Sequence, residues 1–259
     1  MAEFSFDGAV AVVTGGAGGI GKALASKLTT EGARVALVDL DLGAAEAAAS
    51  GLRGAIGLSA DVSNDEAVGG MVDEVERRLG PVDIYCSNAG VATGGGLGED
   101  DAWDLSWRVH VMAHVYAART VVPGMVARGA GAMVVTASAA GLLMMMQSAP
   151  YTVTKHASVA IAEWLAVNYG GSGVQFHCLC PQGVRTPMVS GDARGEAEVA
   201  ASGRIIEPSE VADAVVEAVR QDRFLILPHP EVHSYEKSKA EDRDAWLSRM
   251  RRLRARVAK

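Results

Sequence analysis

The segment that most restricts how this chain can fold is a short apolar run, then a glycine-rich turn, then an amphipathic helix. Residues 9–13 are apolar and rich in valine, as expected of a strand buried on both faces. Residues 14–21 contain five glycines, and residues 22–31 then repeat apolar positions at helical spacing. This order directs backbone N–H groups and the positive end of a helix dipole at a phosphate. It predicts a dinucleotide site, with a plain glycine-rich turn as the alternative.

A second apolar run, residues 34–39, ends in Asp39, which stands 18 residues after Gly21. A carboxylate at a spacing of about 20 residues is expected to bond the ribose hydroxyls of an adenosine. The alternative is a structural Asp39 that caps the following helix.

Apolar strands alternate with helical patterns along the whole chain, which predicts α/β architecture: a Rossmann-like, doubly wound, mostly parallel sheet of seven strands flanked by helices. The 259 residues fit one domain, residues 1–259, whose last part, residues 228–259, forms a helical C-terminal extension. Strands are expected at residues 10–13, 35–38, 55–58, 82–86, 132–136, 174–180 and 224–227. Helices are expected at residues 20–30, 42–52, 65–79, 101–127, 150–169, 208–221 and over much of 231–257.

Tyr151 and Lys155 lie four residues apart in an expected helix, with Ser138 thirteen residues before the tyrosine. The spacing puts phenol and ammonium on one helix face. A free phenol has a pKa near ~10, and a close cation lowers it. We therefore expect Tyr151 to act as an acid/base tuned by Lys155, with Ser138 binding a substrate oxygen. Tyrosine and lysine at this spacing also occur on ordinary surfaces, so the pattern gains its weight from the other motifs.

The pattern Thr-Gly-x-x-x-Gly-Ile-Gly, with Gly15, Gly19, Ile20 and Gly21, is followed by Asn88-Ala-Gly90, Ser138 and Tyr151-x-x-x-Lys155. Together these motifs resemble the short-chain dehydrogenase/reductase family over about residues 6–227. The resemblance implies catalytic roles for Ser138, Tyr151 and Lys155, with Lys155 also bonding the nicotinamide ribose. The implied activity is hydride transfer between a nicotinamide cofactor and a secondary alcohol or ketone.

The same resemblance implies further cofactor contacts. Asp61 and Val62 would bind the adenine, although Asp61 also suits a turn, and Asn88 would lie on the adenosine side. Val184 and Thr186 would hold the nicotinamide carboxamide, and Gln182 stands where many members have glycine. NADP-dependent members tend to carry Arg or Lys in the glycine loop or after the second strand. Residues 16–18 and 40–41 contain neither, so Asp39 favours NAD over NADP.

His110 occupies the position at which the family usually has an asparagine that kinks the helix and holds a water beside the lysine. An imidazole can also pass protons at neutral pH. Three interpretations stay open: a working relay, a tolerated substitution, or a cofactor-binding protein with little catalysis. His114, one turn later, is expected to be an ordinary helix-face residue.

Residues 142–146, with three methionines, predict a flexible apolar wall and a medium-sized hydrophobic alcohol or ketone as substrate. Core or subunit-interface packing is the alternative use of these methionines. Residues 190–206 are expected to form a lid over the substrate or an ordinary surface helix.

The composition argues for a cytoplasmic enzyme. The formal charge of −7 disfavours nucleic acid, and no apolar run approaches the ~18 residues that span a bilayer. The three cysteines, Cys86, Cys178 and Cys180, are expected to be buried free thiols rather than metal ligands. The basic stretch of residues 246–259 has one apolar stripe, so we expect a helix packed on protein rather than on a membrane. The family resemblance implies a homodimer or homotetramer.

Overall fold

Seven parallel strands form one sheet in the order β3-β2-β1-β4-β5-β6-β7 in the computed structural model of the chain, which describes residues 4–190 and 203–257. The strand order runs outward from β1 on one side and from β4 on the other, so it reverses between these two neighbours. All seven predicted strands are confirmed, with ends shifted by one or two residues. They are β1 (Val10–Thr14), β2 (Arg34–Asp39), β3 (Ile56–Ser59), β4 (Ile84–Ser87), β5 (Gly131–Thr136), β6 (Val174–Leu179) and β7 (Leu225–Ile226).

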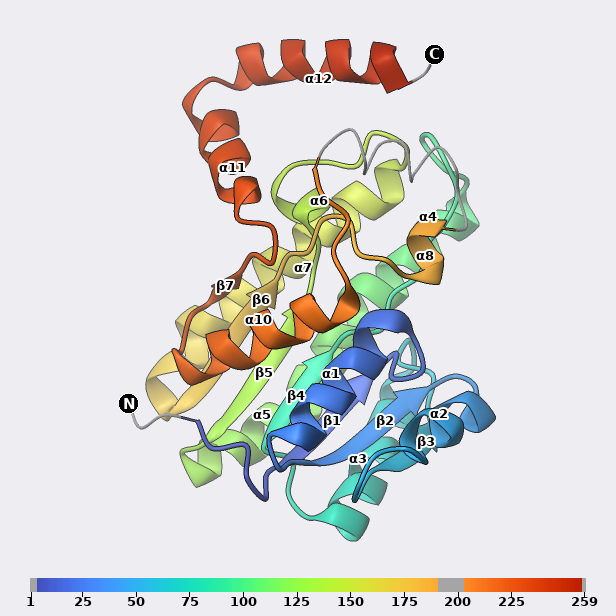
Figure 1. The fold of residues 1–259 in the computed structure, drawn as a ribbon, viewed down its shortest axis with the longest axis vertical. Coiled ribbons are helices and arrows are strands. Elements are labelled where there is room, and N and C mark those ends of the chain that lie inside the picture. The colour runs from blue at the N-terminus through green and yellow to red at the C-terminus, as the bar shows by residue number, and fades with distance from the viewer. Residues whose placement is uncertain (1–3, 191–202, 258–259) are drawn as a thin grey trace.

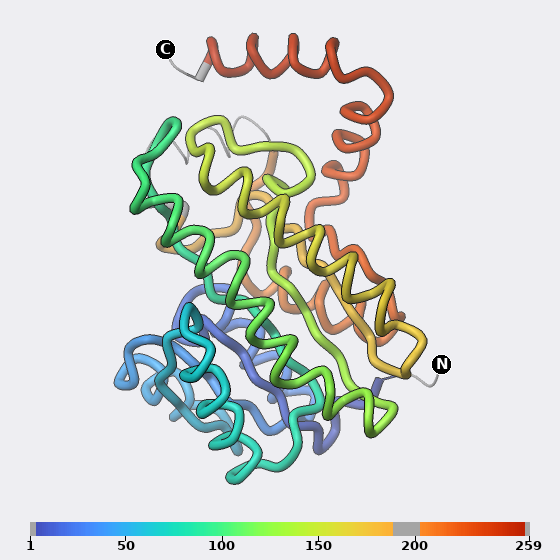
Figure 2. The backbone as a smooth tube through the Cα atoms, turned by 180° about the vertical axis from the view of Figure 1, so that it is seen from behind, coloured from blue at the N-terminus to red at the C-terminus, as the bar shows by residue number. Residues whose placement is uncertain are grey.

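Helices cover both faces of the sheet, as Figures 1 and 2 show from opposite sides. One face carries α1 (Gly19–Thr30), α2 (Leu42–Ala49) and α10 (Pro208–Arg220), which pack Leu24, Leu28 and Val215 into one apolar core. The other face carries α3 (Asp65–Leu79), α5 (Ala113–Arg128) and α7 (Ala149–Tyr169), with Val72 and Val121 in a second core. Coverage on both sides explains why every residue of β1, β4, β5 and β6 is buried.

Shorter elements gather at the carboxyl ends of the strands. These are α4 (Asp100–Trp107), α6 (Ala139–Leu142) and α8 (Pro187–Ser190), and a 3₁₀ turn (Gly170–Ser172) follows α7 at the opposite edge of the sheet. The segment predicted as a lid lies mostly outside the described residues, which resume at Gly203 and include Ile206.

The predicted single helix over residues 101–127 is wrong in one detail. A π-helical segment, η1 (Arg108–Met112), separates α4 from α5, and His110 is its central residue. The His110 ring is bonded to the backbone of Val91 and to Thr154, and its carbonyl to Ser158. A π segment accommodates such contacts because the i→i+5 ladder widens the helix locally.

The predicted C-terminal helix is also divided, into α11 (Glu231–Glu241) and α12 (Arg243–Val257). Asp242 between them is extended, with φ −146° and ψ 95°, and its carboxylate accepts a hydrogen bond from the Ala245 N–H. An aspartate that caps the next helix in this way ends the previous one.

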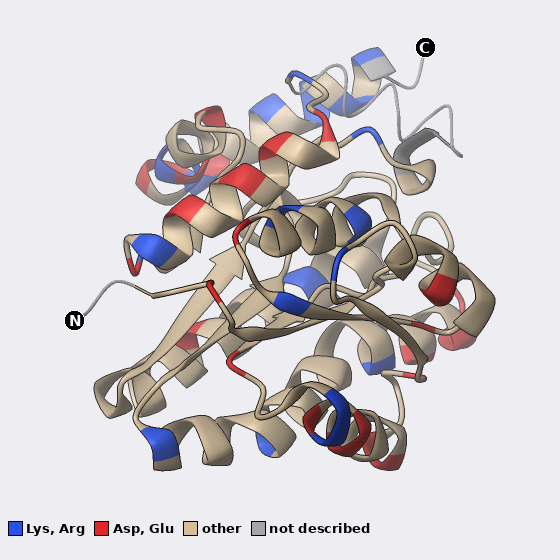
Figure 3. Cartoon of the chain, turned by 60° about the horizontal axis from the view of Figure 1, so that its bottom comes forward, with Lys and Arg blue, Asp and Glu red and all other residues tan. Residues whose placement is uncertain are grey.

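Helices α11 and α12 extend beyond the carboxyl ends of the strands, away from the sheet (Figure 1). Helix α12 has six arginines and one aspartate, whereas both acidic and basic residues occur along the rest of the ribbon (Figure 3). Its residue Trp246 is buried against α11, which confirms packing on protein for this part of the helix. Within residues 4–190 and 203–257, no helix is both long and apolar enough to cross a membrane.

Candidate active site

The glycine loop between β1 and α1 has no room for side chains at several positions. A Cβ added to Gly21 would lie 2.0 Å from the Gly15 carbonyl oxygen, and one added to Gly16 would lie 2.9 Å from the Leu37 Cβ. Gly15 has a φ of +64°, which L-residues with side chains rarely adopt. The loop therefore folds tightly over the start of α1, whose first N–H groups point into it.

Two expected cofactor segments, distant in sequence, meet at this loop. A Cβ added to Gly19 would lie 2.6 Å from the Thr186 Cγ2 atom. The segment before Thr186 is fixed by pairing of Val184 with Ile206, in which the Arg185 N–H donates to the Ile206 carbonyl. The structure thus brings Gly19, Val184 and Thr186 to one side of the crevice.

Asp39 lies at the end of β2 and contacts the glycine loop directly. Its Oδ2 atom accepts from the Ala17 N–H at 3.1 Å and its Oδ1 atom from the Leu40 N–H at 2.9 Å. It does not cap α2, because Asp41 has that role. Asp61, by contrast, accepts from the Ser63 N–H at 2.9 Å, which is the turn geometry considered as its alternative.

Asn88 joins three strands. Its side-chain amide donates to the Thr14 carbonyl at 3.0 Å, and its side-chain oxygen accepts from the Thr136 hydroxyl at 3.3 Å. Its backbone N–H donates to the Thr14 hydroxyl. The side chain expected on the adenosine side of the cofactor is therefore used to fix β1, β4 and β5 where the strand order reverses.

The structure brings together the three predicted catalytic residues at the carboxyl ends of β5 and β6. Ser138 follows β5 and caps α6 by accepting from the Ala140 N–H at 3.1 Å. Tyr151 lies in the first turn of α7, where the Ser138 hydroxyl is close enough to lower the pKa of its phenol. The Lys155 Nζ atom donates to the Thr136 carbonyl at 2.9 Å and lies 5.7 Å from the centre of the Tyr151 ring.

Burial has the largest effect on the pKa values of Tyr151 and Lys155. It raises the pKa of the Tyr151 phenol above its usual value of 10, and the hydrogen bond with Ser138 opposes that rise. Burial also lowers the pKa of Lys155 to about 8. The expected lowering of the tyrosine pKa by Lys155 is therefore wrong in this structure, where the ammonium donates to a carbonyl and both groups are desolvated.

His110 is fully occupied by protein contacts. Its Nε2 atom accepts from the Val91 N–H at 3.1 Å, so Nδ1 carries the proton and donates to the Thr154 hydroxyl at 2.9 Å. Its carbonyl accepts from the Ser158 hydroxyl at 2.7 Å. Burial lowers the pKa of His110 to about 2, so the ring is neutral at physiological pH. These contacts argue against His110 as a proton carrier.

His114 is not a surface residue of the helix. It is fully buried, and its Nδ1 atom lies 2.6 Å from the Ser87 hydroxyl. Burial lowers its pKa to about 3. The three cysteines are buried free thiols, as predicted, and the described residues contain no cluster of metal ligands.

The sequence did not predict the residues that support the loops of the site, and His229 is one of them. Its Nδ1 atom accepts from the Gln182 N–H at 3.2 Å, and its Nε2–H faces the carbonyl oxygens of Gly183 and Arg204 at 3.1 and 3.0 Å. His229 thereby fixes the loop that carries Val184. Nothing in its local sequence distinguishes it, because its partners come from elsewhere in the chain.

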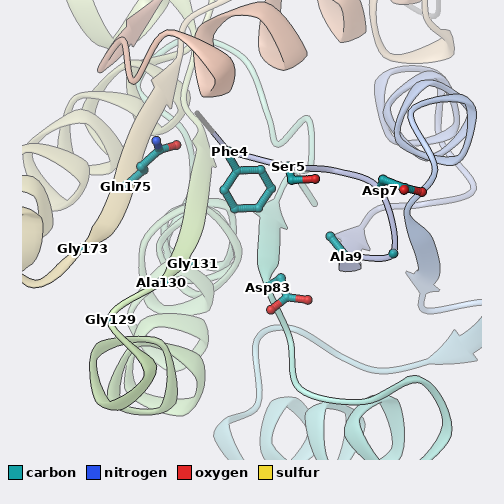
Figure 4. Close-up of a pocket in the computed structure, with 11 residues that line it drawn as sticks. Phe4, Ser5, Asp7, Ala9, Asp83, Gly129, Ala130, Gly131, Gly173 and Gln175 are labelled. Carbon is teal, nitrogen blue, oxygen red and sulfur yellow. The ribbon is translucent and has the colours of Figure 1, made fainter. Parts of the chain in front are cut away.

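A pocket of about 650 Å³ lies at the opposite end of the strands, beside Phe4, Asp83 and Gln175 (Figure 4). It adjoins the amino ends of β1, β4 and β6. Ligands of open α/β sheets bind outside the carboxyl ends, where the strand order reverses. We therefore place the candidate site between the glycine loop, Ser138 and Tyr151 rather than in this pocket.

Comparison with known proteins shows the family of the chain. The family described as "short chain dehydrogenase" matches residues 9–197 of this chain. The 1-deoxy-11-beta-hydroxypentalenate dehydrogenase of Streptomyces exfoliatus is 36% identical over 84% of this chain and 82% of its own length.

Solved structures share the fold. A short chain dehydrogenase/reductase from Burkholderia phymatum in complex with NAD has a TM-score of 0.84 and 30% identity over 93% of this chain and 96% of its own. L-Sorbose reductase from Gluconobacter frateurii, complexed with NADPH and L-sorbose, has a TM-score of 0.77 and 29% identity over 85% of this chain and 95% of its own. The chain belongs to the short-chain dehydrogenase/reductase family, and it is an oxidoreductase that acts on an alcohol or ketone with a nicotinamide cofactor.

Proposed function

We propose that the chain is an NAD-dependent dehydrogenase of medium-sized hydrophobic secondary alcohols, with the reverse ketone reduction at the same site. The observation that carries the proposal is the convergence of Ser138, Tyr151 and Lys155 near a tight glycine loop: the Ser138 hydroxyl lowers the pKa of the phenol, and the Lys155 Nζ atom lies 5.7 Å from the centre of its ring. These groups supply a hydroxyl to bind the substrate oxygen and a phenol to exchange its proton.

The residues around the crevice fit a dinucleotide. The absent side chains at Gly15, Gly19 and Gly21 leave backbone N–H groups exposed to a pyrophosphate at the start of α1. Val184 and Thr186 would hold the carboxamide end, Ile20 would contact the cofactor at the glycine loop, and Asp61 and Val62 would contact the adenine. When bound, the cofactor supplies a carbon that accepts or gives a hydride.

The preference for NAD is argued from charge. Asp39 is held at the glycine loop by the Ala17 N–H, and neither residues 16–18 nor residues 40–41 contain a basic side chain. A carboxylate in this place accepts from ribose hydroxyls and repels a 2′-phosphate, which carries about two negative charges. One related structure contains NAD and another contains NADPH, so the relatives do not decide between the two cofactors. The preference for NAD is therefore inferred from the residues of this chain.

The proton transfers follow from Tyr151. In ketone reduction the protonated phenol donates to the carbonyl oxygen while Ser138 binds the same oxygen. In alcohol oxidation Tyr151 must first lose its proton, and burial raises its pKa. We therefore expect the oxidation rate to rise, and the reduction rate to fall, as the pH increases above neutrality. Lys155, whose pKa burial lowers to about 8, would bind the nicotinamide ribose.

The substrate class is argued from residues 142–146. Leu142 and Leu143 are half-buried, and Met144 is 37% exposed. The loop is fixed at Met145, whose backbone N–H and carbonyl both contact the Thr152 hydroxyl next to Tyr151. Apolar side chains on a loop that is attached to α7 next to Tyr151 favour a hydrophobic substrate.

The test is a substrate panel measured by NADH absorbance, with hydrophobic secondary alcohols, polyols and acyl thioesters, each with NAD and NADP. We expect the highest kcat/KM with a hydrophobic secondary alcohol and NAD. Turnover of polyols or acyl thioesters alone would contradict the substrate class, and a preference for NADP would contradict the role of Asp39.

A second candidate is a cofactor-binding member with weak catalysis, favoured by one observation: every hydrogen-bonding atom of the His110 ring and its carbonyl is engaged by protein groups. The same panel run on His110→Asn separates the two. Activity that arises only in the variant would favour this second candidate, and comparable activity in both proteins would favour the dehydrogenase.

A further inference from the structure

Lys239 is a buried lysine of α11 that lies outside the proposed catalytic groups. It is 8% exposed, and its Nζ atom lies 2.6 Å from the Leu142 carbonyl oxygen, 2.8 Å from that of Leu143 and 3.3 Å from the His156 Nε2 atom. An ammonium group has three N–H donors. The three acceptors therefore account for its full hydrogen-bonding capacity, which is the arrangement that makes burial of a lysine tolerable.

The two carbonyls belong to the end of α6, the turn that begins at Ser138. Ser138 caps the amino end of this turn through the Ala140 N–H, and Lys239 binds the last carbonyls at its carboxyl end. A cation at a helix C-terminus satisfies carbonyls that have no partner within the helix. One end of a four-residue turn thus carries the proposed substrate-binding hydroxyl, and Lys239 fixes the other end.

The third acceptor belongs to the helix that carries Tyr151. His156 follows Lys155 on α7, and its Nδ1–H donates to the Thr152 carbonyl at 2.9 Å, which leaves Nε2 free to accept from Lys239. The two elements are in direct backbone contact as well, since a Cβ added to Gly141 would lie 2.4 Å from the Lys155 carbonyl oxygen. Lys239 therefore connects α6 to α7 on the side away from the glycine loop.

An aromatic ring of the C-terminal extension also packs against Lys239. The Trp246 ring of α12, 6% exposed, has its centre 5.1 Å from the Lys239 Nζ atom. A cation over an indole face is attracted to it, more strongly when solvent is excluded. The extension contributes the cation and its aromatic cover, and the catalytic elements contribute the acceptors.

We propose that Lys239 is a positioning residue: by binding the end of α6 and His156 of α7, it holds Ser138 and Tyr151 in register toward one substrate oxygen. The inference rests on the proposed dehydrogenase function. It assigns to the C-terminal extension a part in positioning the catalytic groups from outside the glycine loop.

The test uses the full chain and compares three variants. Lys239→Met keeps the length of the side chain and removes its donors, and Lys239→Arg keeps donors. Lys237→Met is the matched control, because Lys237 is exposed on the same helix and pairs only loosely with Glu241, at 3.9 Å. For each protein we would measure kcat, KM, the dissociation constant of NAD, and hydrogen exchange of the backbone amides of residues 139–147.

A small displacement of a catalytic group can cost up to ~100-fold in rate. Lys239→Met should therefore lower kcat by ~10- to 100-fold, leave the NAD dissociation constant unchanged within about twofold, and speed exchange in residues 139–147. Lys237→Met should match the wild type, and Lys239→Arg should recover most of the lost rate.

Several results would overturn the proposal. It fails if Lys239→Met keeps the wild-type kcat, if residues 139–147 exchange as slowly as before, or if Lys239→Arg is as impaired as Lys239→Met. Hydrogen exchange needs no turnover, so it separates this inference from the proposed function. A wild type that oxidises no alcohol would contradict the function, while unchanged exchange in the variant would contradict the positioning role alone.

Discussion

Different kinds of contact hold the two halves of the candidate site in place. We call the region around the glycine loop the cofactor half and the region around Ser138 and Tyr151 the catalytic half. Around the glycine loop the decisive contacts are steric: Gly21 packs on the Gly15 carbonyl and Gly19 on Thr186, at distances that exclude any side chain. Around Ser138 and Tyr151 the decisive contacts are buried polar ones, made by His110 and Lys239 to hydroxyls, carbonyls and an imidazole.

This difference has consequences for what breaks each half. The packing of the glycine loop does not depend on pH, and it is disrupted when side-chain atoms are added. A buried polar network fails when a donor is removed or a neutral group is protonated, because an unpaired polar group in the interior costs about 1–3 kcal/mol. The variants below separate the two kinds of failure.

Among the variants that compare the two halves, Ser138→Ala is expected to have the largest effect. Removing a hydroxyl that stabilises charge on a reacting oxygen lowers kcat by about 10²–10³-fold. NAD affinity should change little, because Ser138 lies in the catalytic half. Steady-state kinetics and NAD titration measure the two quantities, with Ser138→Thr as the control that keeps a hydroxyl. A loss of cofactor affinity as large as the loss of kcat would contradict the division.

The next effect is expected from Gly21→Val, which places atoms 2.0 Å from the Gly15 carbonyl oxygen. Overpacking of this kind costs about 1–3 kcal/mol, so NAD affinity should fall by up to ~100-fold. The control is Gly70→Val on α3, where an added Cβ has nothing within 4 Å. Calorimetric titration with NAD checks it, and equal affinities for both variants would show that the loop tolerates side chains.

A smaller effect is expected from Asp39→Asn. Removal of one negative charge near a 2′-phosphate should raise the affinity for NADP relative to NAD by ~10-fold, which corresponds to about 1.4 kcal/mol. Asp41→Asn, two residues further on, removes the same charge from a side chain that caps α2 and is the matched control. An unchanged ratio of the two dissociation constants in Asp39→Asn would contradict the argument for NAD.

The smallest effect concerns stability and pH. Burial lowers the pKa of His110 from 6.5 to about 2, so below pH 6.5 the unfolded chain binds a proton that the folded chain does not. The free energy of unfolding therefore falls as the pH decreases through this range. Between pH 7 and pH 5.5 the wild type should lose about 1 kcal/mol more than His110→Asn. Denaturant unfolding at both pH values measures this difference, and parallel losses would contradict it.

The tight glycine loop and the position of Asp39 beside it could be predicted from the sequence because their determinants lie close together along the chain. Glycines at fixed spacing after a buried strand imply both the turn and its ligand, and Asp39 follows at the end of the next strand. The strands β1, β4, β5 and β6 could be predicted for the same reason, since each is buried on both faces and forms a local apolar run.

The catalytic half could be predicted only in part. Ser138, Tyr151 and Lys155 are recognisable as a pattern, but their support is not. His110 meets Val91 and Thr154 across 19 and 44 residues, and Lys239 meets Leu142 across 97. No local pattern encodes such contacts. The pKa of Tyr151 was mispredicted for a related reason: helical spacing indicates that a cation is near, but only the fold determines how far both groups are desolvated.

The central claim is that the Tyr151 phenol exchanges the proton of the substrate while the hydride passes to the nicotinamide. It is tested most directly by Tyr151→Phe, measured as transfer of deuterium from a carbinol-deuterated alcohol to the cofactor, beside a titration with NAD. We predict that transfer slows by ~10²–10⁴-fold while the NAD dissociation constant stays within about twofold of the wild type. Transfer at the wild-type rate in Tyr151→Phe would contradict the account.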